Sequence, residues 1–548
     1  MRTFAQNFTQ KKIMTDTEKH HPPTGDGGGT DVKTPELGGV NFNPSPTCVF
    51  EGDADIPAKS KTLRQKAVKG VAWTALQRYS TMLIQFISGI ILARLLTPYD
   101  YGCIGMLMIF MLLAESFIDG GFGSALIQKK RPTQADYSTI FFWNMGLSVL
   151  LYAALFLSAP AIARFYGIPL LSDILRVQGL VLFIYAFNIV QRNQLQKKLN
   201  FKVLSIVTIL TSLTALTVTI VMAWQGFGVW ALVAQNILTA AIPSVVFWFY
   251  VRWRPQWTFS WQSFRELFSF GFYMFLTNLL NQFGQQIQGL LIGRFYDAST
   301  MGYYSKANAT ERLSSTSISK VMSQVTYPLY AEVQDDKTAL GSIIKKITMT
   351  VSYVTFPLMF VLLLCAKPLF ILLYSDRWAD SVPYFQVLCI AGLAYSLQSV
   401  NYQSVAAIGK SRTMFVWTFV KRVMGIVFVV AGLLLAGMKG LLVGMVLNTW
   451  FSYFINIWLV SRHIGYRWHR QLLDITPVLV ASLVAAAATY TIGTFCSLPL
   501  YADGVLKFIL FMVLYTGWSM LFRPEAYQLF CVAAKPFTKK LKRKINKK

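Results

Sequence analysis

Long apolar stretches alternate with short polar ones along most of this chain. Between about residues 70 and 523, runs of roughly twenty mostly apolar residues recur. As a helix that rises ~1.5 Å per residue, each run is long enough to cross a bilayer core of ~30 Å. The pattern predicts an all-α integral membrane protein with about fourteen transmembrane helices, at 71–94, 101–127, 137–160, 173–195, 203–224, 228–250, 265–293, 300–332, 342–365, 383–407, 413–435, 439–461, 472–494 and 504–522.

The composition supports this interpretation. Hydrophobic residues make up 54% of the 548 residues and charged residues 14%, whereas a soluble domain carries about 25% charged residues. A soluble protein is therefore excluded. The net charge of +27 is compatible with a nucleic-acid partner, but the basic residues lie in short clusters between apolar runs, so we expect no nucleic acid.

The basic clusters occupy every second connection between the predicted helices. "QKKRP", "QKKLNFK" and "GKSR" are examples, whereas the intervening turns "TPYDYG" and "WQGFG" carry no Lys or Arg. Cytoplasmic loops of membrane proteins are enriched in these residues. The alternation therefore predicts an even number of helices with both termini in the cytoplasm. It also requires the helix at 300–332, which is too polar to be identified by hydropathy.

A duplication relates the two halves of the chain. Several positions match at an offset of 200 residues, and the matches include Arg and Gly as well as apolar residues. Two six-helix lobes in the same orientation around a central cavity follow from this repeat, which is an arrangement of transporters. The matching pairs are Gln85 and Gln285, Gly89 and Gly289, Arg94 and Arg294, and Gly102 and Gly302.

The repeat defines the predicted organisation of the chain. We expect an N-lobe over 65–255, a C-lobe over 260–465 and two further helices within 470–525. Residues 1–60 are polar and contain "TGDGGGT" and "NPSPT", a composition typical of a disordered tail, here cytoplasmic. Residues 526–548 form a basic cytoplasmic tail.

The stretch "LARLLTPYDYG" (92–102) reads as the external turn between the first two helices. Arg94 complements the C-terminal dipole of the first helix, Pro98 cannot continue that helix, and Asp100 can cap the next one. We expect Arg94 and Arg294 to lie at equivalent depth near the periplasmic face.

Polar residues inside the seventh and eighth helices cannot face lipid, because charge at mid-bilayer costs several kcal/mol. Both helices are expected to line a water-filled cavity, although the amides of the seventh helix fit helix–helix hydrogen bonding equally well. The candidate cavity residues are Asn281, Gln285, Lys306, Arg312 and Lys320, with Glu311 as a candidate for ion coupling or gating.

The first half carries its own charged residues. Arg78 precedes Arg94 by sixteen residues and Glu115 follows Asp100 by fifteen, so the two fall at similar depth along antiparallel helices and could pair. Asp119 lies one turn deeper than Glu115. The group is either an ion-coupling or gating site or a structural ion pair.

Lys421 and Arg422 lie about ten residues into the eleventh helix. They either line the cavity or extend toward the interface. Cations outnumber acids among these candidates, and Arg and Lys bind phosphate well. A cationic chamber suits an anionic cargo such as a diphosphate-linked lipid or an acidic sugar.

The six Cys and four His residues suggest no metal site. The Cys residues have no metal-ligand spacing and fit small core positions, and the His residues all lie outside the predicted helices.

The first two helices carry the most specific resemblance. "GVAWTALQRYSTMLIQFISGIILARLLTPYDYGCIGM" and "FIDGGFGSALIQKK" resemble the Wzx-type polysaccharide flippases, the WzxC-like lipopolysaccharide biosynthesis proteins in particular, within the MOP exporter superfamily. The resemblance spans about residues 65–525 and weakens in the second half.

This resemblance implies a MATE-like fold with two lobes around a central cleft. It implies a transporter, not an enzyme, that moves an undecaprenyl-diphosphate-linked oligosaccharide across the bacterial inner membrane by alternating access. A proton or sodium gradient would drive it, with no bound cofactor. Its partners would be the polyprenyl-linked glycan, membrane lipids and other polysaccharide-assembly proteins.

One alternative remains open within the same superfamily. A MATE-like multidrug or cation antiporter would need acidic cavity residues, of which Glu115, Asp119 and Glu311 are the candidates. A membrane enzyme is disfavoured, because the longest external connection, "AKPLFILLYSDRWADSVP", offers no recognisable catalytic arrangement.

Overall fold

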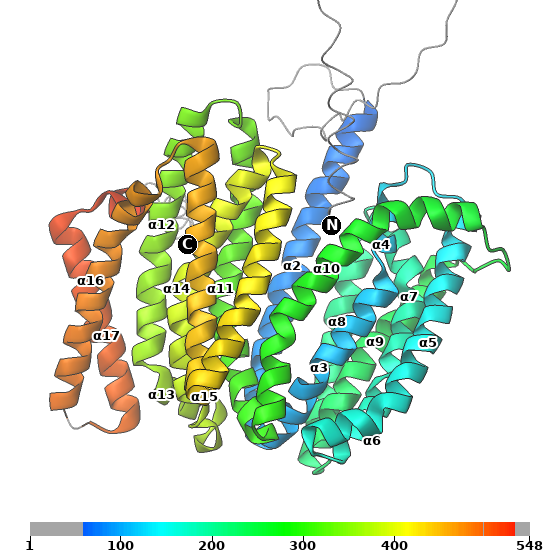
Figure 1. Ribbon diagram of the computed structural model, residues 1–548, viewed down its shortest axis with the longest axis horizontal. Coiled ribbons are helices and arrows are strands. Elements are labelled where there is room, and N and C mark those ends of the chain that lie inside the picture. The colour runs from blue at the N-terminus through cyan, green and yellow to red at the C-terminus, as the bar shows by residue number, and fades with distance from the viewer. Residues whose placement is uncertain (1–57, 497, 532–548) are drawn as a thin grey trace, which may run out of the picture. The chain divides into compact units, whose positions relative to one another are not determined.

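The computed structural model describes residues 58–496 and 498–531, which fold into helices joined by short connections, without a β-strand in these ranges (Figure 1). The N-terminal group of helices consists of α2 (Ala58–Leu95), α3 (Pro98–Asp119), α4 (Phe122–Gln128), α5 (Gln134–Tyr166), α6 (Leu170–Gln178), α7 (Leu180–Lys197), α8 (Phe201–Trp224) and α9 (Val229–Val251). The C-terminal group consists of α10 (Trp261–Phe295), α11 (Ala298–Glu332), α12 (Lys337–Leu364), α13 (Ala366–Tyr374), the 3₁₀ turn η1 (Asp376–Trp378), α14 (Ser381–Ala407), α15 (Ser411–Ile464), α16 (Trp468–Phe495) and α17 (Leu500–Phe522).

These helices confirm the predicted all-helical membrane fold. The segments α3 and α4 together form one predicted span, as do α6 and α7. Helix α15 contains two spans, separated by non-helical backbone at Ala436 and Gly437. By length and composition, nine helices in the described part of the chain qualify as membrane spans. The more polar α2, α10, α11 and α14 do not qualify, and α11 is the predicted polar span at 300–332.

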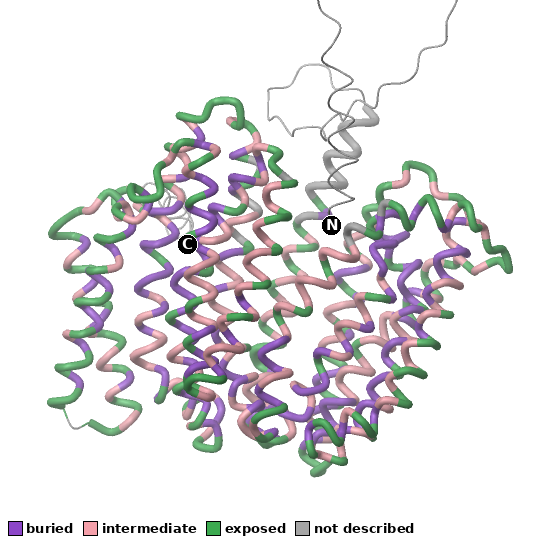
Figure 2. The backbone as a smooth tube through the Cα atoms, in the orientation of Figure 1, coloured by how far each residue is buried: buried purple, intermediate pink, exposed green. Residues whose placement is uncertain are grey.

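Burial along the spans follows their position in the bundle. In the apolar window of α12, 61% of the residues are buried, whereas in that of α17 only 17% are. Exposed residues accordingly follow much of α16 and α17 (Figure 2). Apolar side chains exposed in this way are what a lipid-facing surface requires, so these two helices lie at the edge of the bundle.

Both predicted tails fall mostly outside the described residues. Within 1–60, only residues 58–60 are described, and they begin helix α2. Within 526–548, residues 526–531 are described and helical. The lobe boundaries predicted from the repeat stay predictions.

Two glycines let α3 and α11 cross in close contact. A carbon added at Gly102 would lie 1.7 Å from the carbonyl oxygen of Ala298, and one added at Gly302 would lie 1.8 Å from that of Pro98. Both distances are far below van der Waals contact, so no larger residue fits. Residues 98 and 298, like 102 and 302, are related by the 200-residue offset. The contact is therefore reciprocal, as a two-fold axis between the repeats requires.

The two helices that cross here begin with related caps. Thr97 is the N-cap of α3 and accepts a hydrogen bond from the Asp100 amide (3.3 Å), while the Asp100 carboxylate accepts one from the Thr97 amide (2.9 Å). The prediction for Asp100 is thus right only in part, because Asp100 completes a capping box and Thr97 is the N-cap. In α11, Asp297 is the N-cap and accepts from the Thr300 amide (3.0 Å).

Arg94 and Arg294 occupy equivalent positions at the C-terminal ends of α2 and α10. The Arg94 side chain donates to the carbonyl of Leu373 at 3.1 Å, at the end of α13. The Arg294 guanidinium lies 5.1 Å from the ring centre of Phe165, near the end of α5. Both side chains are exposed, and their equal depth in a membrane stays a prediction.

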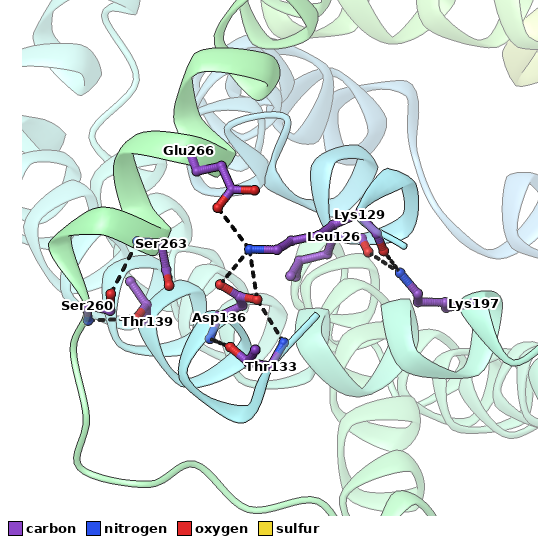
Figure 3. Close-up of polar contacts among 9 residues, drawn as sticks. All are labelled: Leu126, Lys129, Thr133, Asp136, Thr139, Lys197, Ser260, Ser263 and Glu266. Carbon is purple, nitrogen blue, oxygen red and sulfur yellow. Dashed lines mark hydrogen bonds and ion pairs between the residues drawn. The ribbon is translucent and has the colours of Figure 1, made fainter. Parts of the chain in front are cut away.

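Helix α10 joins the two groups of helices. It packs on α3, α4 and α5 as well as on α11 and α15. Its first turns are clamped to the N-terminal group by Lys129, which bridges Glu266 of α10 (2.9 Å) and Asp136 of α5 (3.1 Å) (Figure 3). The Ser260 amide donates to the Thr139 hydroxyl at 3.0 Å beside it. These contacts fix where α10 starts and hence which of its residues face the centre.

Substituting Gly102 tests the crossing of α3 and α11. We expect Gly102→Ala to lower the stability of the purified protein by about 1–3 kcal/mol, because the added methyl group collides with backbone. Thermal unfolding in detergent measures the change. Gly146→Ala is the matched control, since nothing lies within 4 Å of a carbon added at that helical glycine. Equal unfolding temperatures for the two variants would contradict the crossing.

The Lys129 clamp predicts a pH dependence. Burial acts to lower the pKa of Lys129, but the hydrogen bonds that Lys129 donates to Glu266 and Asp136 outweigh it, so this pKa lies above its ordinary value. The clamp's contribution is therefore complete below the unfolded pKa of about 10.4 and is lost as the pH rises through the raised pKa. We expect Lys129→Met to cost up to ~1 kcal/mol at pH 8, with the difference from wild type shrinking in strong alkali. A pH-independent difference would argue against the clamp.

Candidate functional site

Three cavities with polar residues in their walls follow one another across the two groups of helices. The N cavity (about 710 Å³) is lined by α2, α3 and α6–α9, the middle cavity (about 630 Å³) by α3, α7, α10 and α15, and the C cavity (about 710 Å³) by α10, α11, α14 and α15. Glu115 and Tyr185 line both the N and the middle cavity. Asn281 and Arg422 line both the middle and the C cavity. Because neighbouring cavities share lining residues, the three lie in a row, which we call the polar path after the amides and charged side chains along it.

The acidic wall of this path belongs to α3. Glu115 and Asp119 both line the middle cavity, one turn apart on the same helix. Opposite them, α10 contributes the amides Asn278, Asn281 and Gln282. The predicted stripe of amides on α10 thus faces the middle cavity. This agrees with the interpretation that the stripe lines a cavity, which stood beside helix–helix hydrogen bonding.

The cationic wall belongs to α11 and α15. Lys421 donates to the Asn456 side chain at 2.9 Å, and Arg422 donates to Asn281 at 3.1 Å. Lys320 is exposed in the same C cavity. The residues that line the C cavity include no Asp or Glu. Amide partners hold these cations without neutralising them, so their charge remains available to an anion.

Arg312 and Gln285 extend this wall into the middle cavity. Arg312 donates to the Gln285 side chain at 3.1 Å, and Gln285 lines the cavity. Seven of the predicted site residues therefore line the cavities, and Arg312 reaches the middle cavity through its hydrogen bond to Gln285. The seven are Asn281, Gln285, Lys320, Lys421, Arg422, Glu115 and Asp119.

Lys306 lies outside the three cavities, contrary to the prediction. It is only 5% exposed and donates to the carbonyl of Gly89 at 2.6 Å. This bond links α11 to α2. Three aromatic rings surround its ammonium group, an arrangement that favours a cation. They belong to Tyr374 (4.1 Å), Tyr101 (5.0 Å) and Trp378 (5.5 Å).

Arg78 also lies outside these cavities, and its predicted ion pair with Glu115 is not formed among the described residues. The cavity-lining face of α2 carries Thr74, Gln77 and Thr81. Arg78 follows Thr74 by four residues and precedes Thr81 by three, so it shares this face of α2, but it is not among the residues that line the three cavities. Glu311 is buried at 6% exposure between α11 and α14 and does not line the three cavities.

Arg192 is a cavity residue that the sequence interpretation missed. It lines the N cavity from α7, near Tyr185, Asn188 and Glu115. The sequence does point to this residue, because "NIVQRNQ" places an Arg inside a predicted span. The same signal led to Lys421 and Arg422. Among the described residues, no group of three or more His, Cys, Asp or Glu side chains is placed to hold a metal ion.

Relatives of known name cover most of this chain at low identity. The teichuronic acid biosynthesis protein TuaB of Bacillus subtilis is 26% identical over 65% of this chain and 74% of its own length. The lipopolysaccharide biosynthesis protein WzxC of Escherichia coli is 24% identical over 79% of this chain and 88% of its own. The succinoglycan biosynthesis transport protein ExoT of Rhizobium meliloti is 23% identical over 66% and 74%.

Solved structures show the same fold. The lipid II flippase MurJ, in an inward closed conformation, superposes with a TM-score of 0.66 at 14% identity and covers 82% of this chain and 98% of its own. An inward-facing multidrug resistance transporter of the MATE family, in the MOP superfamily, gives a TM-score of 0.56 at 16% identity, over 70% of this chain and 94% of its own. The helices of this chain are therefore arranged as in these two proteins.

A family described as polysaccharide biosynthesis proteins matches residues 91–383. This range spans 293 of the 548 residues (383 − 91 + 1), more than half of the chain. It includes the crossing of α3 and α11 and the acidic wall of the cavities. The chain therefore belongs to the family of polysaccharide biosynthesis proteins.

Proposed function

We propose that this protein is a flippase for a lipid-linked oligosaccharide. Its cargo is an undecaprenyl-diphosphate-linked repeat unit of O-antigen, capsule or exopolysaccharide, which it moves across the bacterial cytoplasmic membrane. The observation that carries the proposal is the polar path across the two groups of helices, with cations that no Asp or Glu neutralises in the wall of the C cavity. Membership of the polysaccharide biosynthesis family supports it.

The chemistry of the path fits the two polar parts of such a cargo. Lys421 and Arg422 suit a diphosphate, because Arg binds phosphate oxygens in a bidentate manner and Lys adds a point charge. Sugar hydroxyls both donate and accept hydrogen bonds, and the amides and hydroxyls along the path can do the same. Examples from the three cavities are Asn281, Gln282, Asn456 and Gln77.

Alternating access is the mechanism that this fold supports. The polar path would open to one side of the membrane and then to the other, with the α3–α11 crossing near one end of the bundle. Basic connections in every second loop favour cytoplasmic termini. An ion gradient, of protons or sodium, drives the cycle without a bound cofactor, and Glu115 and Asp119 are the acids at the middle cavity for coupling or gating. Enzymes that assemble the glycan and proteins that polymerise it are the expected partners.

Deleting the gene in its native host tests the function. We expect undecaprenyl-linked glycan to accumulate on the cytoplasmic face of the membrane and the surface polysaccharide to be lost. Mass spectrometry of the lipid fraction and surface staining measure the two effects. Normal surface glycan combined with new sensitivity to cationic drugs would instead support a multidrug antiporter.

Removing one charge tests the cationic wall. We expect Arg422→Gln to weaken cargo binding about 10- to 100-fold, since a hydrogen bond to a charged group contributes ~1.5–3 kcal/mol. Reconstituted vesicles that carry a lipid-linked glycan give the KM of flipping. Lys439→Met removes a cation that is exposed beside the break in α15 and should leave the KM unchanged. An unchanged KM for Arg422→Gln would remove this residue from the binding site.

A further inference from the structure

Glu311 is a buried carboxyl group with an unused oxygen atom. It lies on α11 against α14 and is 6% exposed. Its Oε1 has no hydrogen-bond partner among the described residues. A carbon added at Gly392 of α14 would lie 2.6 Å from this atom, so the glycine makes room for the carboxyl group. The fold thus accommodates a group that is costly to bury in its ionised form unless it is paired.

The surroundings of Glu311 offer little to a metal ion. The same added carbon at Gly392 would lie 2.8 Å from the sulfur of Met359 on α12, so a thioether borders the carboxyl group on that side. The hydroxyl of Ser315 is its hydrogen-bonding neighbour. The charged and titratable groups around it are Arg312 and Tyr304 of α11 and Cys389 of α14. Hard cations such as Na⁺ need several oxygen ligands, and sulfur is a poor substitute.

A seam of serine residues leads from Glu311 to the C cavity. Ser315, Ser319 and Ser323 follow Glu311 at four-residue intervals and so share one face of α11. Ser399 of α14 donates to the carbonyl of Ser319 at 3.3 Å, and its hydroxyl lies 2.7 Å from that of Ser323. Ser319, Ser323 and Ser399 line the C cavity.

This seam differs from an ordinary apolar helix contact. Ser315 and Ser319 are buried, at 1% and 7% exposure, yet their hydroxyl groups form a polar line one turn apart. A group that moves between the C cavity and Glu311 therefore passes hydroxyls and carbonyls instead of hydrocarbon. The line ends at the carboxyl group of Glu311, to which Ser315 is hydrogen-bonded.

We propose that Glu311 binds the coupling proton and exchanges it with the C cavity along this serine seam. Binding is a simple protonation: one proton adds to the carboxylate, and no other bond forms or breaks. The proposal rests on the proposed function, because it takes the C cavity to be the cargo site. It assigns the coupling ion as a proton instead of sodium and places its site in the α11–α14 contact.

Infrared difference spectra of the purified full-length protein test proton binding without any cargo. Between acidic and neutral pH, wild type should show a carboxylic C=O band that Glu311→Gln loses. Asp173→Asn is the matched control, because the Asp173 side chain is 65% exposed on α6, and its solvated carboxyl should leave that band in place. A spectrum of Glu311→Gln identical to that of wild type overturns the proposal, whatever the cargo of the protein.

Vesicles with a reconstituted lipid-linked glycan test the coupling. Glu311→Gln should lose the acceleration of flipping by a pH gradient and keep the slow equilibration without a gradient. Ser315→Ala should reduce the acceleration. Ser317→Ala should not, because Ser317 lies on another face of α11 beside Met82. Wild-type flipping that follows a sodium gradient and ignores a pH gradient overturns the proposal. A wild type that flips no glycan contradicts the proposed function and leaves the infrared result to decide on Glu311.

Discussion

The crossing of α3 and α11, with Gly102 against Ala298 and Gly302 against Pro98, sets how closely the two halves of this protein meet. Because each glycine lies against the backbone carbonyl of the other helix, α3 and α11 touch with no side chain between them. Every cavity residue on these helices lies farther along in the same direction: Glu115 is ~20 Å beyond Gly102, and Lys320 is ~27 Å beyond Gly302. The two helices are in close contact near their N-terminal ends. Their charged cavity residues lie toward the C-terminal ends of the same helices.

A symmetric framework carries an asymmetric set of charges. The repeat gives both halves a glycine at the crossing and an Arg at the end of the preceding helix. The first half then contributes Glu115 and Asp119 to the middle cavity, whereas the second half contributes Arg422 and, in the C cavity, Lys421. At equivalent positions of the repeat, Met106 and Lys306 differ in charge. The two halves therefore share their scaffold and differ in the charges that they place in the cavities.

Sequence periodicity predicted the helices well but the surroundings of single side chains less well. The fourteen predicted ranges, the polar α11 included, follow from patterns over tens of residues, and the structure has a helix at each of them. The duplication predicts the reciprocal contact at Gly102 and Gly302. Arg78 shows the limit, since it shares a face of α2 with the cavity-lining Thr74 and Thr81 and still does not line the cavities. Lys306 shows another: its environment is built by Tyr374 and Trp378, some seventy residues away in the chain, and no local pattern reveals such a contact.

The caps of α3 and α11 use the same two residue types in opposite order. Thr97 and Asp100 serve in the first half, and Asp297 and Thr300 in the second. Changing Thr97 alone to Asp would put two carboxylates into one cap, and changing Asp100 alone to Thr would leave two hydroxyls. Descent from one ancestral repeat therefore required paired replacements, or a weakened cap between them. Such a position should show correlated variation among relatives, and the order of the pair can serve to tell first-half from second-half segments.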